Sequence, residues 1–310
     1  MGKTYNQETI HQVTLGFAAL ITDLLFPEFT EAIRFWVLGI VIILVGMPHG
    51  SLDHIIAYHS FPEKNKTEKR IWFYGYYTAL MAAYAMLWIW FPLFSFLIFL
   101  LITLYHFGQA DAERFQLPSL PKNILLYSRG LTIVGLILYG SDPVYISEVV
   151  EVITGFSSLS LISGYVEIPV LTLTFASIYP IGYLFVLSFL QRNELPAIYL
   201  LDALIVPALF AIADPIFAFS IYFGGWHSFN HIKTMLSYLN SRNLDVSMNW
   251  FYRKTLLLSF ISYAALAALY FVMQAFGNED LLVGLLFILI SVLTLPHIFI
   301  VETMYRKFRQ

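Results

Sequence analysis

The chain has 310 residues, of which 59% are hydrophobic and only 12% are charged, a composition outside the range of soluble globular proteins and typical of integral membrane proteins. The formal net charge of −3 comes without any extended basic stretch, so we expect no nucleic-acid partner. Cysteine is absent, which excludes disulfides and thiolate metal sites.

Apolar runs long enough to cross a bilayer recur along the chain, and they predict an all-α integral membrane protein with about ten transmembrane helices. The polar segment 1–12 lacks the features of a signal peptide, so we expect the first run to be retained. The expected spans are residues 10–26, 32–48, 71–91, 93–110, 123–140, 169–191, 196–213, 215–235, 255–276 and 281–302. The weakest are 10–26 and 196–213, which contain Asp23 and Asp202. The amphipathic, Ser-rich stretch 143–167 predicts an interfacial helix or loop, or else a half-span.

Basic residues alternate between successive connections of these ten spans. Every second connection carries Lys or Arg, whereas the others carry neither, and all of those except the short WFP connection contain acidic residues. Only Arg34, at the start of the second span, departs from the alternation. The positive-inside rule therefore predicts cytoplasmic termini for a single transmembrane domain, residues 1–310, in the cell (inner) membrane.

Histidines from four separated stretches, one of which contains His297, fall at one expected depth, toward the cytoplasmic side. The stretches GMPHGSLDH, YHFGQAD and FGGWHSFNH contain His49, His106, His227 and His231. Intramembrane ionisable residues are rare and usually functional, so we expect these four histidines to bind a shared metal ion. His227 and His231 are one helical turn apart, the arrangement by which one helix supplies two ligands.

Polar residues near the four histidines are candidates for orienting them. Asp53 follows His49 by four residues, and its carboxylate can reach a ligating imidazole if the helix continues there. The full set of such candidates is Asp53, Asp111, Gln109 and His297. A lone intramembrane histidine is more often an interhelical hydrogen-bonding residue than a ligand, which applies to His297, and the roles of His54, His297, Asp202 and Glu302 stay open. Glycines flank the histidines and predict close helix packing around the site.

Imidazole ligands suit iron, zinc, copper and nickel alike, so residue type alone does not select the metal. A closed zinc site would be structural, whereas iron with four histidine ligands keeps positions open for O₂ and an apolar substrate from the bilayer. The aromatic residues beside the ligands are Tyr105, Phe107, Phe223 and Trp226. They predict a flat hydrophobic pocket, although packing against lipid explains most aromatic residues of a membrane protein.

These three stretches, followed by TLPHIFIVE, resemble the successive motifs of the bacteriorhodopsin-related Brp/Blh family of membrane β-carotene 15,15′-dioxygenases. The resemblance extends from about residue 46 to residue 302, and residues 1–45 carry no motif. It implies an Fe(II) enzyme that uses O₂ to cleave β-carotene into two all-trans-retinal molecules. It also implies that the iron ligands are His49, His106, His227 and His231, and that a rhodopsin receives the retinal.

Two other classes of function stay open on the sequence alone. A membrane di-iron desaturase or hydroxylase would need closely spaced histidine clusters, and this chain has no adjacent His pair. A metal or proton transporter would use His297, Asp202 and Glu302 as a polar path, but the outer halves of the spans offer few groups to continue it. Metal stoichiometry and uptake into sealed vesicles distinguish these classes from the dioxygenase.

Overall fold

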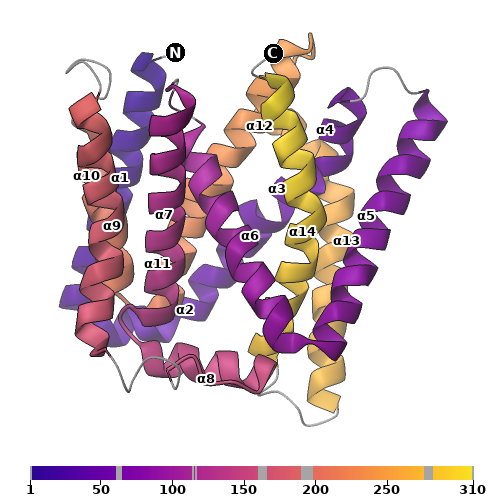
Figure 1. Ribbon diagram of the computed structural model, residues 1–310. Coiled ribbons are helices and arrows are strands. Elements are labelled where there is room, and N and C mark those ends of the chain that lie inside the picture. Colours follow the sequence, from indigo (N-terminus) through magenta and orange to yellow (C-terminus); the bar gives the residue numbers. More distant parts are fainter. Residues whose placement is uncertain are drawn as a thin grey trace. The chain divides into compact units, whose positions relative to one another are not determined.

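The computed structural model describes residues 2–60, 65–113, 115, 117–159, 166–189, 198–275 and 282–308 (Figure 1). Within these ranges the regular structure is helical and no strand occurs, which confirms the all-α prediction. The elements are α1 (Gly2–Leu25), α2 (Pro27–Val41), the π-helix η1 (Ile42–Gly46), α3 (Met47–Ser51), α4 (Asp53–Ser60), α5 (Lys66–Trp90), α6 (Pro92–Ala112), α7 (Ser119–Tyr139), α8 (Pro143–Thr154), α9 (Ile168–Phe189), α10 (Ile198–Ile212), α11 (Pro215–Tyr222), the π-helix η2 (Phe223–Ser228), α12 (Phe229–Ser241), α13 (Met248–Ala275) and α14 (Leu282–Phe308).

Several of these helices are suited to a membrane. Among the described residues, five helical stretches are long and apolar enough to cross one: Pro27–Ser60, Pro92–Ala112, Ile168–Ser188, Met248–Ala275 and Gly284–Phe308. A sixth arises if α7 and α8, which are bent by 91° at their junction, form one broken span. The chain is therefore an all-α membrane protein. The count of ten spans and the cytoplasmic location of both termini stay predictions.

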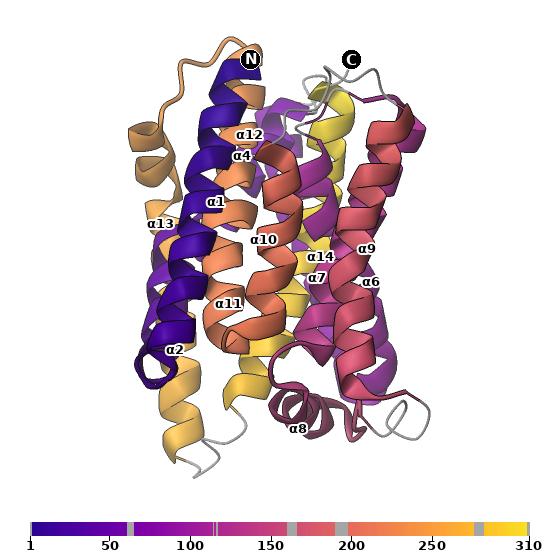
Figure 2. The ribbon, with the colours of Figure 1, turned by 90° about the vertical axis from the view of Figure 1, so that its left-hand side faces the viewer.

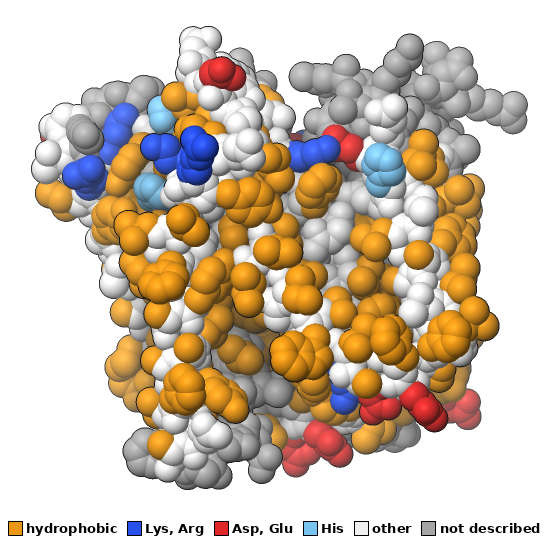
Figure 3. Space-filling view, turned by 180° about the vertical axis from the view of Figure 1, so that it is seen from behind, with side chains coloured by type: hydrophobic (Ala, Val, Ile, Leu, Met, Phe, Trp, Pro, Cys, Tyr) orange, Lys and Arg blue, Asp and Glu red, His pale blue; other side chains and the backbone are white. Residues whose placement is uncertain are grey.

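The surface agrees with a lipid environment. Large apolar side chains such as Trp36, Leu173 and Leu257 are at least 70% exposed. Figure 3 shows one face on which hydrophobic side chains cover the middle, while charged side chains gather at its two ends. Such an apolar band would be costly in water and is favourable in a bilayer.

The chain divides into two compact units, each built from separated segments. Unit 1 comprises Met1–Val41, Thr103–Glu148 and Ser157–Asn230. Unit 2 comprises Ile42–Ile102, Val149–Phe156 and His231–Gln310. Each unit has its own hydrophobic core, so the single domain expected over residues 1–310 stays a prediction.

In unit 1, α10 lies among other helices and is apolar except for the buried Asp202. It packs against α1, α7, α9 and α11 (Figure 2). Its side chains Val206 and Leu209 are at most 1% exposed and lie in the core of the unit.

Reciprocal glycine contacts bring α6 close to α7 in the same unit. A Cβ at Gly108 of α6 would clash with the backbone carbonyl of Leu126, and a Cβ at Gly130 of α7 with that of Leu104. Small residues permit this approach of two backbones. The contact positions His106, two residues before Gly108, against the rest of unit 1.

In unit 2, α14 packs against α4 and α5, and α13 packs against α3. The core between these helices contains Ile56 of α4, Phe251 of α13, and Ile300 and Met304 of α14. These contacts bring together the segments that carry His49, Asp53 and His297.

Candidate metal centre

Unit 2 brings three buried histidines together. His49 comes from α3, His231 from α12 and His297 from α14, and none is more than 8% exposed. The ring centroids are 5.7 Å apart for His49 and His231, 5.1 Å for His49 and His297, and 5.3 Å for His231 and His297. Three buried imidazoles thus lie in one cluster of unit 2, and imidazole is a residue type that divalent transition metals bind.

The carboxylate of Asp53 orients His297. Both oxygens of Asp53 lie 2.8 Å from Nδ1 of His297, and the hydroxyl of Tyr77 donates to Oδ2 of Asp53 at 3.0 Å. An imidazole that donates its Nδ1 proton to a carboxylate presents Nε2 as the nitrogen with a lone pair. His49 has a similar arrangement, because its Nδ1 lies 3.3 Å from the carbonyl oxygen of Val45.

The sequence had placed Asp53 one helical turn after His49, on the condition that the helix continues. It does not continue, because α3 ends at Ser51 and α4 begins at Asp53, with a turn at Leu52 between them. Although Asp53 follows His49 by four residues, the two side chains are therefore not one turn apart on a single helix. The carboxylate instead contacts a histidine from α14, which is 244 residues away along the chain.

Unit 1 contains the other two predicted ligands as a buried pair. The ring centroids of His106 on α6 and His227 in η2 are 4.8 Å apart, with the ring planes at 77°. Phe107 contacts His227 edge-on at 4.6 Å, and Phe223 stacks on the same ring at 5.4 Å. The pair thus lies among aromatic rings that exclude water.

His227 and His231 are linked by one helix, as the sequence predicts. η2 ends at Ser228, and α12 follows directly from Phe229. His106 lies in unit 1, whereas His231 and His297 lie in unit 2, and each of these buried imidazoles has nitrogen atoms of the kind that bind metal ions.

Irregular helix geometry accompanies the histidines. The π-helix η2 contains His227, and the π-helix η1 ends directly before α3, which carries His49. π-Helical turns are rare and occur frequently at functional sites. His49 and His297 each follow a proline, Pro48 and Pro296, which lacks the N–H that would continue the helical hydrogen bonds.

The other predicted orienting residues lie in unit 1, on α6. Nε2 of Gln109 donates to the hydroxyl of Tyr105 at 3.3 Å. Asp111 accepts hydrogen bonds from Tyr222 at 3.3 Å and from Asn230 at 3.1 Å, and it forms an ion pair with Arg129. Both Gln109 and Asp111 are fully buried.

The predicted pocket residues differ in their surroundings. Phe107 and Phe223 contact His227 directly, whereas the ring of Tyr105 lies 6.4 Å from that of Tyr127. Trp226 is completely buried in the core of unit 1, and its indole N–H donates to Asp202 at 2.6 Å.

The residues left open by the sequence also have partners. Nδ1 of His54 lies 3.0 Å from the carbonyl oxygen of Ser51. Glu302 is partly buried and forms an i,i+4 ion pair at 3.5 Å with the exposed Arg306, as expected of a carboxylate near an interface. Asp202 pairs with Arg129 at 2.7 Å.

Sequence reasoning missed Arg129 and Tyr77. Arg129 is the basic residue inside the expected span 123–140, and Asp202 is the acid inside 196–213. Two opposite charges buried in apolar spans predict an ion pair, so this signal was available. Tyr77 had no comparable signal, because tyrosine is common in this chain.

The glycines expected to permit close packing are Gly46, Gly50, Gly108, Gly224 and Gly225. A Cβ at Gly108, Gly224 or Gly225 would lie within 3.0 Å of a neighbouring atom, whereas a Cβ at Gly50 would meet no described atom within 4 Å. The prediction was therefore wrong for Gly50, which follows His49 on an open side of the short helix α3.

Comparison with known proteins gives two matches. A family model described as "Beta-carotene 15,15'-dioxygenase" matches residues 40–305. A curated relative of the same name, from the uncultured marine bacterium 66A03, is 26% identical over 280 residues, which cover 87% of this chain and 94% of the relative. No solved structure matches the chain. The family match includes all five buried histidines and Asp53 but leaves α1 outside.

Proposed function

The chain belongs to the β-carotene 15,15′-dioxygenase family, and from this premise we propose that it cleaves the central double bond of β-carotene with O₂. The products are two all-trans-retinal molecules. Each aldehyde contains one of the two oxygen atoms of O₂, so the reaction needs no added reductant. The family match over residues 40–305 is the observation that carries the proposal.

We further propose that Fe²⁺ is the cofactor and that its ligands are His49, His106, His227 and His231. The donor chemistry supports this, because all four side chains are buried imidazoles and imidazole is a common ligand of iron. Bound iron would supply the activation of O₂. His297 stands beside His49 and His231 and presents Nε2, so we assign it to the same centre as a residue that supports the ligands.

The protein itself would hold the imidazoles, orient the polyene and exclude water. The contacts of Val45 with His49 and of Asp53 with His297 fix ring orientation and tautomer. Phe107 and Phe223, which flank His227, are suited to contact a flat conjugated chain. We assign Tyr105 to the same pocket. We assign Trp226 a supporting role behind the pocket, where its hydrogen bond to Asp202 holds it in place.

The location follows from the apolar substrate and the helical fold. We propose a multi-pass protein of the cell (inner) membrane, with the metal centre toward the cytoplasmic side. β-Carotene would enter from the lipid bilayer, and retinal would pass to a rhodopsin.

Expression in a bacterium that accumulates β-carotene tests the proposal. We expect loss of the orange colour and retinal in the extract. His227→Ala should abolish both retinal formation and iron retention in the purified protein, because it removes one proposed ligand. The matched control is His11→Ala, since His11 is exposed on α1 outside the family match. Products other than retinal would refute central cleavage, and normal turnover by His227→Ala would refute the ligand assignment.

A further inference from the structure

Polar contacts in unit 1 bind the helix that carries His227 at three successive turns. The hydroxyl of Tyr222 donates to Asp111, the indole N–H of Trp226 donates to Asp202, and the amide of Asn230 donates to Asp111. Tyr222, Trp226 and Asn230 are spaced four residues apart, so they lie along one side of the helix. The three donors come before, within and after η2.

The two acceptor carboxylates are joined by one arginine. Nη1 of Arg129 on α7 lies 2.7 Å from Asp202 on α10, and its Nε pairs with Asp111 on α6. All three side chains are at most 1% exposed. The Arg129 guanidinium also lies 4.9 Å from the centroid of the Tyr179 ring. Buried ion pairs in a low dielectric tolerate little displacement, because a charge that loses its partner remains desolvated.

A fourth contact comes from α1. Nε2 of Gln12 donates both to the backbone carbonyl of Gly225, at 3.0 Å, and to Oδ1 of Asn230, at 2.7 Å. Gln12 is only 4% exposed, although it lies on a helix with a polar N-terminal half. It thus holds a carbonyl inside η2 and a side chain just beyond it.

The position of a π-helical turn decides where the later side chains point. A π-turn accommodates one extra residue, so removing it would rotate every following side chain by about 100°, and moving it along the helix would rotate the side chains between its old and new positions. Because Tyr222, Gly225, Trp226 and Asn230 are all held, η2 cannot move along the helix without breaking several buried hydrogen bonds.

We propose that Gln12, Asp111, Arg129 and Asp202 act together as a register support that fixes the π-turn η2 and so directs His227 and His231. These four are positioning residues, and this role rests on the proposed function in that His227 and His231 are taken as metal ligands. Through Gln12, the helix α1 would thus help to shape the site, although α1 lies outside the family match.

Two mild variants test the register support. Gln12→Met keeps the length of the side chain but removes its two donors, and Trp226→Phe keeps an aromatic ring but removes the indole N–H. In purified protein we expect each variant to bind Co²⁺ about 10–100-fold more weakly, the range typical when a group that orients ligands is removed. We also expect an altered cobalt absorption spectrum. In metal-free protein, amide hydrogen exchange across residues 222–231 should be faster.

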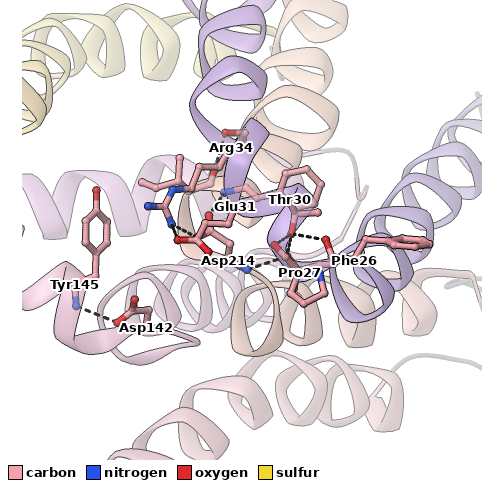
Figure 4. A network of polar contacts seen from close by, with 12 residues as sticks. Phe26, Pro27, Thr30, Glu31, Arg34, Asp142, Tyr145 and Asp214 are labelled. Carbon is pink, nitrogen blue, oxygen red and sulfur yellow. Dashed lines mark hydrogen bonds and ion pairs between the residues drawn. The ribbon is translucent and has the colours of Figure 1, made fainter.

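The matched control is a second ion pair of the same unit, at the start of α11. The side chains of Arg34 and Asp214 are 2.6 Å apart (Figure 4). Asp214 also caps α11, because its carboxylate accepts a hydrogen bond from the backbone N–H of Phe217. Arg34→Gln should lower the thermal stability but leave the Co²⁺ affinity and spectrum unchanged.

The outcomes separate the two proposals. If Gln12→Met and Trp226→Phe lose stability as Arg34→Gln does but keep the parent affinity, spectrum and exchange rates, the register support is refuted. If the parent protein retains no iron and forms no retinal, the proposed function fails. The exchange measurement on metal-free protein then still decides whether these contacts hold η2.

Discussion

Asp53 connects three helices of unit 2 through one carboxylate. It begins α4, accepts from Tyr77 of α5 and holds Nδ1 of His297 on α14. It is 2% exposed, so its charge is stabilised by these donors rather than by water. The orientation of the imidazole is thus coupled to a residue far away in sequence.

Asp53→Asn tests this coupling. An amide accepts a hydrogen bond less strongly than a carboxylate, so His297 should be oriented less well, and iron affinity should fall about 10–100-fold. A competition titration against a chelator measures the change. Asp245→Asn, at an exposed position between α12 and α13, provides the control and should bind iron normally. Equal affinities of the two variants would show that Asp53 serves the fold and not the metal centre.

The candidate ligands could be predicted from the sequence, but their partners could not. Histidines in apolar spans are conspicuous, and the spacing of His227 and His231 is local. The contact of Asp53 with His297 depends on which helices pack together and on the turn at Leu52. A single sequence shows neither.

At the scale of elements, each expected span overlaps observed helices, because length and hydropathy suffice to predict a helix in an apolar segment. The π-helices η1 and η2 were not predicted, since the same residues are equally compatible with regular α-helix. Contacts from other helices decide whether such a segment forms a π-helix or an α-helix, as the hydrogen bond from Gln12 of α1 to the carbonyl of Gly225 illustrates. The irregularities lie at the candidate site, where local preference and function conflict most often.

The close approach of α6 and α7 is testable through Gly108. Gly108→Ala places a methyl group against the Leu126 carbonyl, so the helices must separate, at a cost of about 1–3 kcal/mol of stability. Thermal unfolding in mild detergent measures this loss. Gly39→Ala on α2 is the control, because a Cβ there meets no described atom within 4 Å. It should be neutral or stabilising by roughly 0.5–1 kcal/mol, since alanine favours a helix. Similar melting temperatures of both variants would contradict a close contact at Gly108.

At the scale of the whole molecule, Arg34 accounts for the exception in the charge pattern. The guanidinium pairs with Asp214 at 2.6 Å, and its side chain is only 21% exposed. This ion pair gives Arg34 a structural role within unit 1, and the remaining Lys and Arg residues still alternate between connections. The observed helices are less decisive about the number of spans, because α10 has only 15 residues and α1 is polar over its first half.

Reporter fusions test the predicted topology. Green fluorescent protein fused to either terminus should fluoresce, and alkaline phosphatase at the same positions should be inactive, because both termini are predicted to be cytoplasmic. A phosphatase fusion after Glu167, in the expected outer connection between α8 and α9, should be active and serves as the positive control. Active phosphatase at one terminus alone would mean an odd number of spans. Since α1 covers one of the two weakest expected spans, deleting residues 1–26 and repeating the C-terminal fusion then shows whether α1 is the helix that fails to cross.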